Sequence, residues 1–177
     1  LATCTSGEVF EDGLGEFSAV RNGLLSCYPE DVRLKKLAAR AATMAQSGQY
    51  NFPRLMRRGD VFGARLALAE FLNAALSMLY LLNFRYEPFY KWQFAGAEGL
   101  VAMSEALPYL KDIAASSTRR DAGAIARDIE AASALAISEL KLQGLTDAAG
   151  DYLEPHAYSI MSKIEDPEIR GLHVMEG

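Results

Sequence analysis

The chain has 177 residues, 50% of them hydrophobic and 23% charged, with a formal net charge of −5. A chain of this length and apolar content can bury a sizeable core, so we expect one domain. Its two cysteines, Cys4 and Cys27, fit no metal-binding or redox spacing, which predicts free thiols and a cytoplasmic location. No basic segment followed by an apolar run opens the sequence, so we expect no secretory signal.

Charge is distributed unevenly along the chain. Residues 1–20 hold four acidic and no basic residues, residues 21–91 hold eleven basic and five acidic ones, and residues 92–177 hold seven basic and fourteen acidic ones. A basic middle between acidic ends could attract a ligand that carries phosphate. Ordinary solvated helix faces would give the same distribution, and both interpretations stay open.

The first part of the chain predicts a connector and two helices. Residues 1–13 contain two glycines and no helical periodicity, which is typical of a connector. From Leu14 to Tyr28, apolar residues recur three or four positions apart, as on one face of a helix. Pro29 is followed by two acidic residues, a favourable start for a second helix that reaches about Ser47.

We expect a break over residues 48–60. Two glycines, Asn51 and Pro53 interrupt the helical pattern there, and three arginines cluster in the same stretch. A short helical turn should lie between the interruptions. Asp60, directly after Gly59, should then cap the next helix.

The segment from Asp60 to Arg85 is almost continuously apolar. A helix that is hydrophobic on nearly all sides is normally enclosed by others. We therefore predict an all-α, up-and-down helical bundle around this central helix (about residues 60–85), with additional short helices. Glu70, Asn73 and Ser77 have the spacing of one helix face, which is the first place to expect function. Charged side chains inside the segment disfavour a membrane span, so we expect no membrane partner.

Aromatic residues dominate the segment after the central helix. Four of them surround a proline and a lysine at residues 86–92. Such a cluster most often packs a corner of the core, although it also suits the rim of a binding site. Residues 96–117 predict a weaker helical segment with Pro108 inside it.

The remaining chain predicts two more helices and no strand. Thr118 with Asp121 resembles a capping box for a helix that reaches Gln143, with Gly144 as its terminator. A last helix should open at residue 146 or 147 and bend or restart at Pro155. We expect it to stop at Asp166 and Pro167.

Most motifs of known catalytic sites are missing. The sequence has no GxGxxG, no Walker lysine loop and no nucleophile elbow. His156 and His173 are too far apart for a helical metal pair, so a packing or surface role is expected for each. Asp128 and Glu130 have the spacing of a metal-binding acidic pair, but within a helix such neighbours point apart.

Three segments resemble one family. They read YPEDVRLKKLAARAATMAQSGQYNFPRLMRRGD, LLNFRYEPFYKW and LEPHAYSIMSKIEDPEIRGLHVMEG. They resemble the C-terminal part of an uncharacterised bacterial family of nucleotidyltransferase-like proteins, a region catalogued as a domain of unknown function. Family members carry an N-terminal polymerase-beta-like domain with a Gly-Ser turn and acidic metal ligands, and this sequence holds neither. The resemblance implies that residues 1–13 connect a missing nucleotidyltransferase domain to a single helical bundle at residues 14–177.

At the level of fold, the chain is similar to the helical domains of kanamycin-type nucleotidyltransferases and to HEPN domains. In the kanamycin type, the helical domain closes the substrate side of the cleft, helps to pair subunits and supplies a carboxylate as general base. The resemblance thus implies Mg²⁺ and a nucleoside triphosphate for the full-length protein, and no cofactor for this chain. The expected partners are the missing domain, a second copy in a homodimer and a small-molecule acceptor of unknown identity. Nucleic acid is not expected.

Glu70 is the candidate general base, because an acid in an apolar helix must find a partner or raise its pKa. The alternative is a structural ion pair with Arg65 or with an arginine of the 54–58 cluster. No residue is expected to bind metal. The other candidates form a substrate-binding set, in which the arginines match triphosphate oxygens and the remainder suit either a binding rim or turn stabilisation. They are Gln49, Tyr50, Asn51, Arg54, Arg57, Arg58, Asn73, Lys91 and Trp92.

The leading functional hypothesis is therefore the helical substrate-side or dimerisation domain of a nucleotidyltransferase-like protein, not catalytic alone. One alternative is a HEPN-like RNA-processing or toxin module. Its Arg-x(4–6)-His motif is not matched, because Arg170 precedes His173 by only three positions. The other alternative is a purely structural interaction domain.

Overall fold

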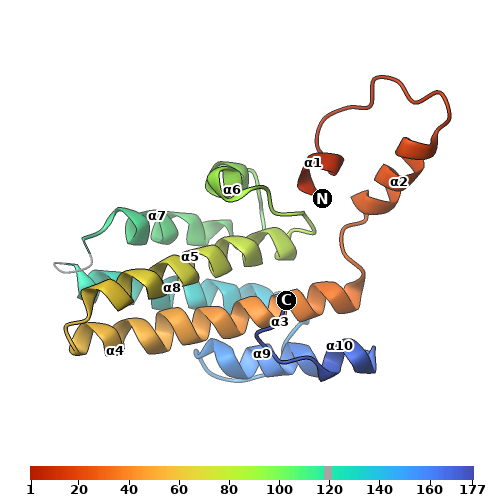
Figure 1. Cartoon of the computed structure of the whole chain (residues 1–177). Helices are drawn as coiled ribbons and strands as arrows, with labels where there is room; N and C mark the ends of the chain where they lie inside the picture. Colours follow the sequence, from red (N-terminus) through yellow and green to blue (C-terminus); the bar gives the residue numbers. More distant parts are fainter. Residues whose placement is uncertain (118–120) are drawn as a thin grey trace.

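The computed structural model describes residues 1–117 and 121–177, and within them the chain is helical and without strands. The predicted all-α bundle around a central apolar helix is confirmed (Figure 1). A π-helix, Ala45–Asn51, joins α3 to α4, and a 3-10 helix, Ser104–Ala106, precedes α7. The α-helices are α1 (Ala2–Thr5), α2 (Glu16–Leu25), α3 (Glu30–Met44), α4 (Phe52–Arg57), α5 (Val61–Leu82), α6 (Tyr90–Ala97), α7 (Leu107–Ala115), α8 (Ala122–Leu142), α9 (Leu153–Ser162) and α10 (Pro167–Gly171).

The break predicted over residues 48–60 is wrong for most of its length. The chain stays helical from α3 through the π-helix into α4, and it turns only at Arg58 and Gly59. Pro53 has no amide hydrogen and cannot donate the backbone hydrogen bond of an α-helix. It lies in the first turn of α4, directly after the wider π-helix, so the helix continues although this bond is missing. Gly48 faces the Phe71 ring so closely that a Cβ atom there would overlap it. The glycine therefore serves close helix packing rather than a turn.

The central helix α5 begins where the sequence predicts. The Asp60 carboxylate caps it by accepting a hydrogen bond of 2.8 Å from the Gly63 amide. Phe71, Met78 and Leu79 of α5 are fully buried. By length and composition alone, the helix could cross a membrane. However, 61% of its most apolar 18-residue stretch is buried inside the bundle.

Helix α3 lies between α5 on one side and α9 on the other, as Figure 1 shows. Helix α8 packs against α7 and also contacts α4, α5 and α9. Leu37 and Met44 of α3, Ile129 of α8 and Leu153 of α9 are fully buried, so all these layers share one core. Burial of such side chains stabilises the fold by about 1.5–3 kcal/mol each.

An N-terminal arm, residues 1–25, projects away from the bundle (Figure 1). The predicted helix over 14–28 is present as the shorter α2, and α1 interrupts the expected connector over 1–13. Arg21 holds the arm together by donating to the carbonyl groups of Cys4, Thr5 and Gly7. The apolar side of α2 does not face the core, since Phe17 and Val20 are 55% and 66% exposed.

Two prolines in the second half of the chain lie at the beginning of helices. From the sequence, Pro108 was expected inside a helical segment and Pro167 at the end of one. Pro108 and Pro167 each occupy the first turn of a helix, α7 and α10, where a missing amide hydrogen costs nothing. The Asp166 carboxylate caps α10 through the amides of Glu168 and Ile169. Helix α8 ends as predicted, with Gly144 at φ +67°. The proposed capping residue Thr118 lies outside the described residues.

Candidate functional site

A cleft of about 290 Å³ lies between α3, α5 and α6. The predicted polar face of α5 lines it, with Glu70, Asn73 and Ser77. These three residues occupy one side of α5 because helical positions three, four and seven apart share a face. The large buried apolar residues of α5 lie on its other side. One face of the helix therefore packs in the core and another lines the cleft.

Glu70 is exposed, and its expected burial in the apolar core is wrong. The pairing expected as an alternative is absent too: the ion pairs of the described residues join Arg33 to Glu30 and Lys163 to Asp147. Arg65 instead lines a separate groove between α5 and α7, beside Ile113. Glu70 is therefore a carboxylate at the cleft wall that forms no ion pair in the part of the chain described, and Arg40 lines the same cleft.

Helix α6 forms the outer wall of the cleft. The Tyr80 hydroxyl of α5 donates a hydrogen bond of 2.7 Å to the Gln93 carbonyl of α6. Gly96 permits this contact, because a Cβ atom there would meet the Tyr80 hydroxyl oxygen at 2.5 Å. Burial raises the pKa of Tyr80, and the charge of Glu87 adds to the effect. The hydroxyl thus stays protonated and keeps α6 in place.

Three aromatic side chains at the start of α6 do not pack into the core. Phe89, Tyr90 and Trp92 are 64%, 71% and 59% exposed, because the short α6 turns only Gln93 and Ala97 inward. The rings of Phe89 and Tyr90 stack with centroids 4.4 Å apart, and Tyr90 lines the cleft. Of these three aromatics, Tyr90 lines the cleft, whereas Phe89 and Trp92 lie outside its lining.

Arg40 of α3 connects this cleft to a smaller pocket. Its Nε donates a hydrogen bond of 3.1 Å to the Ser77 hydroxyl, and its Nη2 donates one of 2.7 Å to the Gly177 carbonyl. The smaller pocket measures about 60 Å³ and shares Arg40, Ser77 and Glu87 with the cleft. Lys36 and Arg85 line it as well.

The C-terminal tail lies against α3 beside this site. The buried Lys35 ammonium group donates to the carbonyl groups of His173, Val174 and Glu176. Burial lowers the pKa of Lys35, and the nearby Glu176 carboxylate partly opposes that effect. The tail is thereby fixed where Gly177 meets Arg40.

Gln49, in the π-helix, is a structural residue rather than a cleft residue. Its side-chain amide donates to the Glu130 carboxylate at 2.7 Å and to the Asp151 carbonyl at 2.9 Å, and it accepts from the Leu153 amide at 2.9 Å. It therefore ties the π-helix to α8 and to the start of α9. Asn51 is half-buried nearby in the same π-helix.

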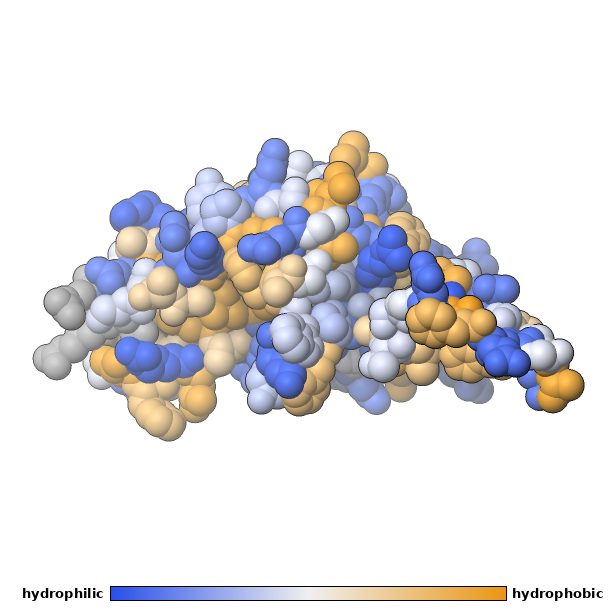
Figure 2. Space-filling view, turned by 90° about the horizontal axis from the view of Figure 1, so that it is seen from above, coloured by the Kyte–Doolittle hydropathy of each residue, from blue (hydrophilic) through white to orange (hydrophobic). Residues whose placement is uncertain are grey.

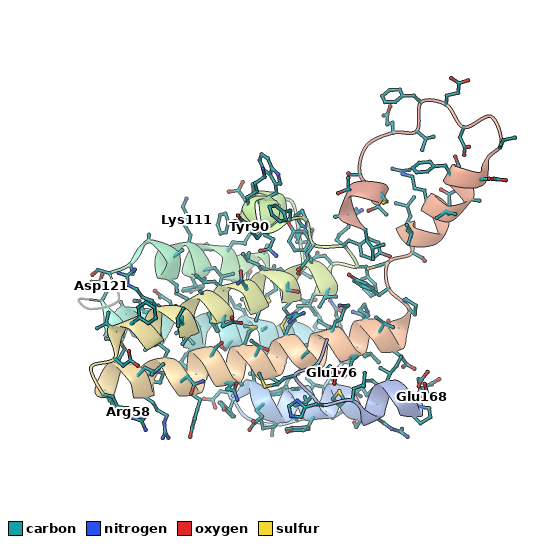
Figure 3. The ribbon with its side chains drawn as sticks, viewed as in Figure 1. Arg58, Tyr90, Lys111, Asp121, Glu168 and Glu176 are labelled. Carbon is teal, nitrogen blue, oxygen red and sulfur yellow. The ribbon has the colours of Figure 1, made fainter. Side chains whose placement is uncertain are left out.

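The remaining candidates are scattered over the surface. The Arg54 guanidinium lies 4.6 Å from the centre of the half-exposed Tyr50 ring. Arg57 and Arg58 are exposed at the end of α4, and Figure 3 shows Arg58 far from Tyr90 of α6. Lys91 and Trp92 sit on α6 but outside the cleft lining, with the Lys91 ammonium 5.4 Å from the Trp92 ring. The structure thus unites Glu70 and Asn73 and leaves the other predicted residues elsewhere.

The two histidines have local roles. His156 is fully buried, with Nδ1 3.0 Å from the Thr146 hydroxyl and Nε2 3.2 Å from the Gly150 carbonyl. His173 is exposed, and its Nδ1 accepts a hydrogen bond from the Met175 amide. Arg170 donates to the Ile164 carbonyl. The described residues contain no group of three or more His, Cys, Asp or Glu side chains placed to hold a metal ion.

The cleft also contains residues that were not predicted from the sequence, namely Arg40, Thr43, Glu87, Tyr90 and Gln93. Arg40 and Thr43 are three positions apart on α3, with Lys36 one turn earlier, so a polar stripe along α3 could have been found from spacing. Glu87 and Gln93 carried no such signal. Their place depends on how the loop after α5 folds back over that helix.

Comparison with known proteins finds one match. Residues 1–93 match the family described as "Domain of unknown function (DUF4037)". No curated protein and no solved structure matches the chain. The matched range contains α1 to α5, the π-helix and the first turn of α6, and with them every residue named above as lining the cleft. Since the match covers more than half of its length, the chain belongs to this family of domains of unknown function, DUF4037.

Proposed function

We propose that this chain is the helical substrate-side domain of a nucleotidyltransferase-like protein and binds the acceptor in the cleft between α3, α5 and α6. It performs no catalysis alone. The nucleotidyltransferase domain of the full-length protein would supply Mg²⁺ and the nucleoside triphosphate. The resemblance of the 28–60 and 81–92 segments to that family motivates the proposal.

The observation that carries the proposal is the convergence of polar groups on one side of an otherwise apolar helix. Glu70, Asn73 and Ser77 of α5 meet Arg40 of α3 and Tyr90 of α6 in a single cleft. Binding sites commonly combine a concave shape with a few polar groups that fix ligand orientation. The Tyr90 ring, which packs against Phe89, adds apolar contact area for a small molecule.

Within this proposal, Glu70 acts as general base. Its carboxylate lines the cleft, is exposed and forms no ion pair among the described residues, so it is free to accept a proton from an acceptor hydroxyl. Asn73, one turn along α5, has both donor and acceptor atoms to orient the same group. The deprotonated oxygen would then be the nucleophile for nucleotidyl transfer.

Exposed apolar side chains on the N-terminal arm support a second element of the proposal, contact with the nucleotidyltransferase domain or with a second copy. Phe10, Leu14, Phe17 and Val20 are 97%, 87%, 55% and 66% exposed. At the right end of Figure 2, where this arm lies, hydrophobic groups stand out beside hydrophilic ones. Clustered exposed apolar residues of this kind are typical of interaction surfaces.

The test is an assay of this chain with nucleoside triphosphates, Mg²⁺ and a panel of hydroxyl and amine acceptors. We expect no transfer by the chain alone and transfer by the full-length protein. Transfer in the full-length protein should depend on Glu70. Robust turnover by this chain alone would refute the assignment as a non-catalytic domain, and full activity of the Glu70→Gln full-length protein would refute the proposed base.

A further inference from the structure

We propose that the small pocket beside the cleft binds an oxyanion, a carboxylate or phosphate group, through Lys36, Arg40 and Arg85. This pocket is distinct from the arginine cluster at residues 54–58, which lies at the end of α4. The oxyanion site stands on its own geometry. Its assignment to the ligand of the adjoining cleft rests on the proposed function.

The first argument is charge. Three cationic side chains line the pocket, and Glu87 is its one carboxylate. Lys36, Arg40 and Arg85 form no ion pair among the described residues. Tyr28 and Tyr80 complete the polar lining as neutral groups, because burial raises the pKa of both phenols. The pocket therefore carries an excess of positive charge, with three cationic side chains against one carboxylate.

The second argument is preorganisation. Arg40 is held by the Ser77 hydroxyl and the Gly177 carbonyl, so its guanidinium is fixed at the junction of pocket and cleft. The Lys36 ammonium lies 5.3 Å from the centre of the Tyr28 ring, a cation–π contact that positions it at the pocket wall. Fixed cationic donors bind oxyanions well because little conformational entropy is lost on binding.

The third argument is size and position. The volume of about 60 Å³ holds several waters or one small oxyanion, since about 10–15 Å³ of such space suffices for a water. The pocket opens beside the cleft through Arg40, Ser77 and Glu87, which line both. A ligand anchored by its anionic group at Arg85 and Lys36 would extend past Ser77 toward Asn73 and Glu70. The acceptor class inferred is thus a small molecule that bears a carboxylate or phosphate.

The experiment is a titration of this chain with inorganic phosphate and, separately, with acetate, each against potassium chloride at equal ionic strength. Amide chemical shifts in NMR spectra report both affinity and location. We expect saturable shifts at Lys36, Ser77 and Arg85 with at least one of the two oxyanions, and none with chloride. The stronger of the two probes identifies the ligand group as phosphate or carboxylate.

Charge-neutral variants complete the test. Lys36→Gln and Arg85→Gln should each weaken oxyanion binding by about tenfold, the usual effect of losing one hydrogen bond to a charged group. Lys111→Gln, on the exposed surface of α7, is the matched control and should leave binding unchanged. Arg85 is exposed, so its variant is expected to fold and carries the test if the Lys36 variant does not.

Two results would overturn the inference. One is chemical shifts that do not saturate with either oxyanion, and the other is a loss of oxyanion affinity in Lys111→Gln equal to the loss in Lys36→Gln and Arg85→Gln. Neither result bears on the role of Glu70, which the transfer assay tests. Conversely, oxyanion binding that persists when the full-length protein shows no transfer would refute the proposed function and leave the oxyanion site in place.

Discussion

The Arg40 guanidinium donates a hydrogen bond of 3.1 Å to the Ser77 hydroxyl, and this contact joins α3 to α5 where the cleft meets the smaller pocket. Ser77 is buried at 7% exposure, whereas Arg40 is half-buried. The Ser77 hydroxyl of the central helix and the Gly177 carbonyl of the tail therefore together fix the cation that both cavities share.

Two buried serines should respond to alanine in opposite directions. Ser77→Ala removes the hydrogen-bond partner of Arg40 and should lower the free energy of unfolding by about 1 kcal/mol. Ser133 is fully buried in α8, and its hydroxyl has no partner among the described residues. Ser133→Ala should raise the free energy of unfolding by about 1 kcal/mol, since a buried unpaired hydroxyl is costly. Urea denaturation measures both changes, and equal signs would contradict the assignment.

Glu70→Gln should separate stability from activity. Because Glu70 is exposed and unpaired in the described chain, the change should move the melting temperature of this chain by less than about 2 °C. Transfer by the full-length protein should fall by at least about 100-fold if Glu70 is the general base. Glu154→Gln, an exposed position on α9, is the control for both measurements. If neither the melting temperature nor the transfer rate changed, Glu70 would be neither a general base nor a partner in a structural ion pair.

Gly48 should tolerate no side chain. A Cβ atom there would overlap the Phe71 ring and press on Ile129, so Gly48→Ala should lower the free energy of unfolding by about 1–3 kcal/mol through overpacking. Gly123 is the matched control. It also lies in a helix, α8, and a Cβ atom there would meet only the Arg127 side chain at 3.8 Å. Gly123→Ala should be neutral or stabilising by up to about 1 kcal/mol.

Gln49 should prove structural. Gln49→Ala leaves the Leu153 amide and the Asp151 carbonyl without their partner, and we expect a loss of about 1–3 kcal/mol in the free energy of unfolding. Hydrogen exchange should also show weaker protection at the start of α9. Gln46→Ala, one turn earlier and exposed, should change the free energy of unfolding by less than about 0.5 kcal/mol. A stable Gln49→Ala variant that had lost ligand binding would instead favour the role predicted from sequence.

Tyr80 should make stability depend on pH in alkaline solution. Its pKa in the folded chain is raised above the usual 10.0, mainly by burial, so the folded chain holds the phenolic proton more tightly than the unfolded chain. The resulting stabilisation is fully present below the unfolded pKa and is lost as pH rises through the folded pKa.

The measurement compares the wild type with Tyr80→Phe by urea denaturation across a pH series. The difference in unfolding free energy should stay constant between about pH 7 and pH 9 and shrink above about pH 10, because phenylalanine does not titrate. Other groups with shifted pKa values, such as Lys35, contribute equally to both proteins and cancel in the difference. A difference that stays constant to the highest pH would contradict the raised pKa.

Residue spacing determined much of the fold. The apolar run from Asp60 to Arg85 predicted the central helix, and the Asp60 cap and the end of α8 before Gly144 followed from local chemistry. The shared face of Glu70, Asn73 and Ser77 predicted one wall of the cleft. Such features depend on contacts within a few residues, which the sequence displays directly.

Tertiary structure decided the rest. Gly48 and Pro53 read as a break, but packing of Gly48 against Phe71 and a wider π turn keep the chain helical. Glu70 read as a core residue and the aromatics at 86–92 as a core corner or a binding rim, and the structure leaves Glu70, Phe89, Tyr90 and Trp92 exposed. Lys36, Arg40 and Arg85 converge only when α3 and the loop after α5 meet. The physical reason is that contacts between distant segments decide which side chains are buried and which charged side chains come together. Local sequence patterns do not show which segments will be in contact.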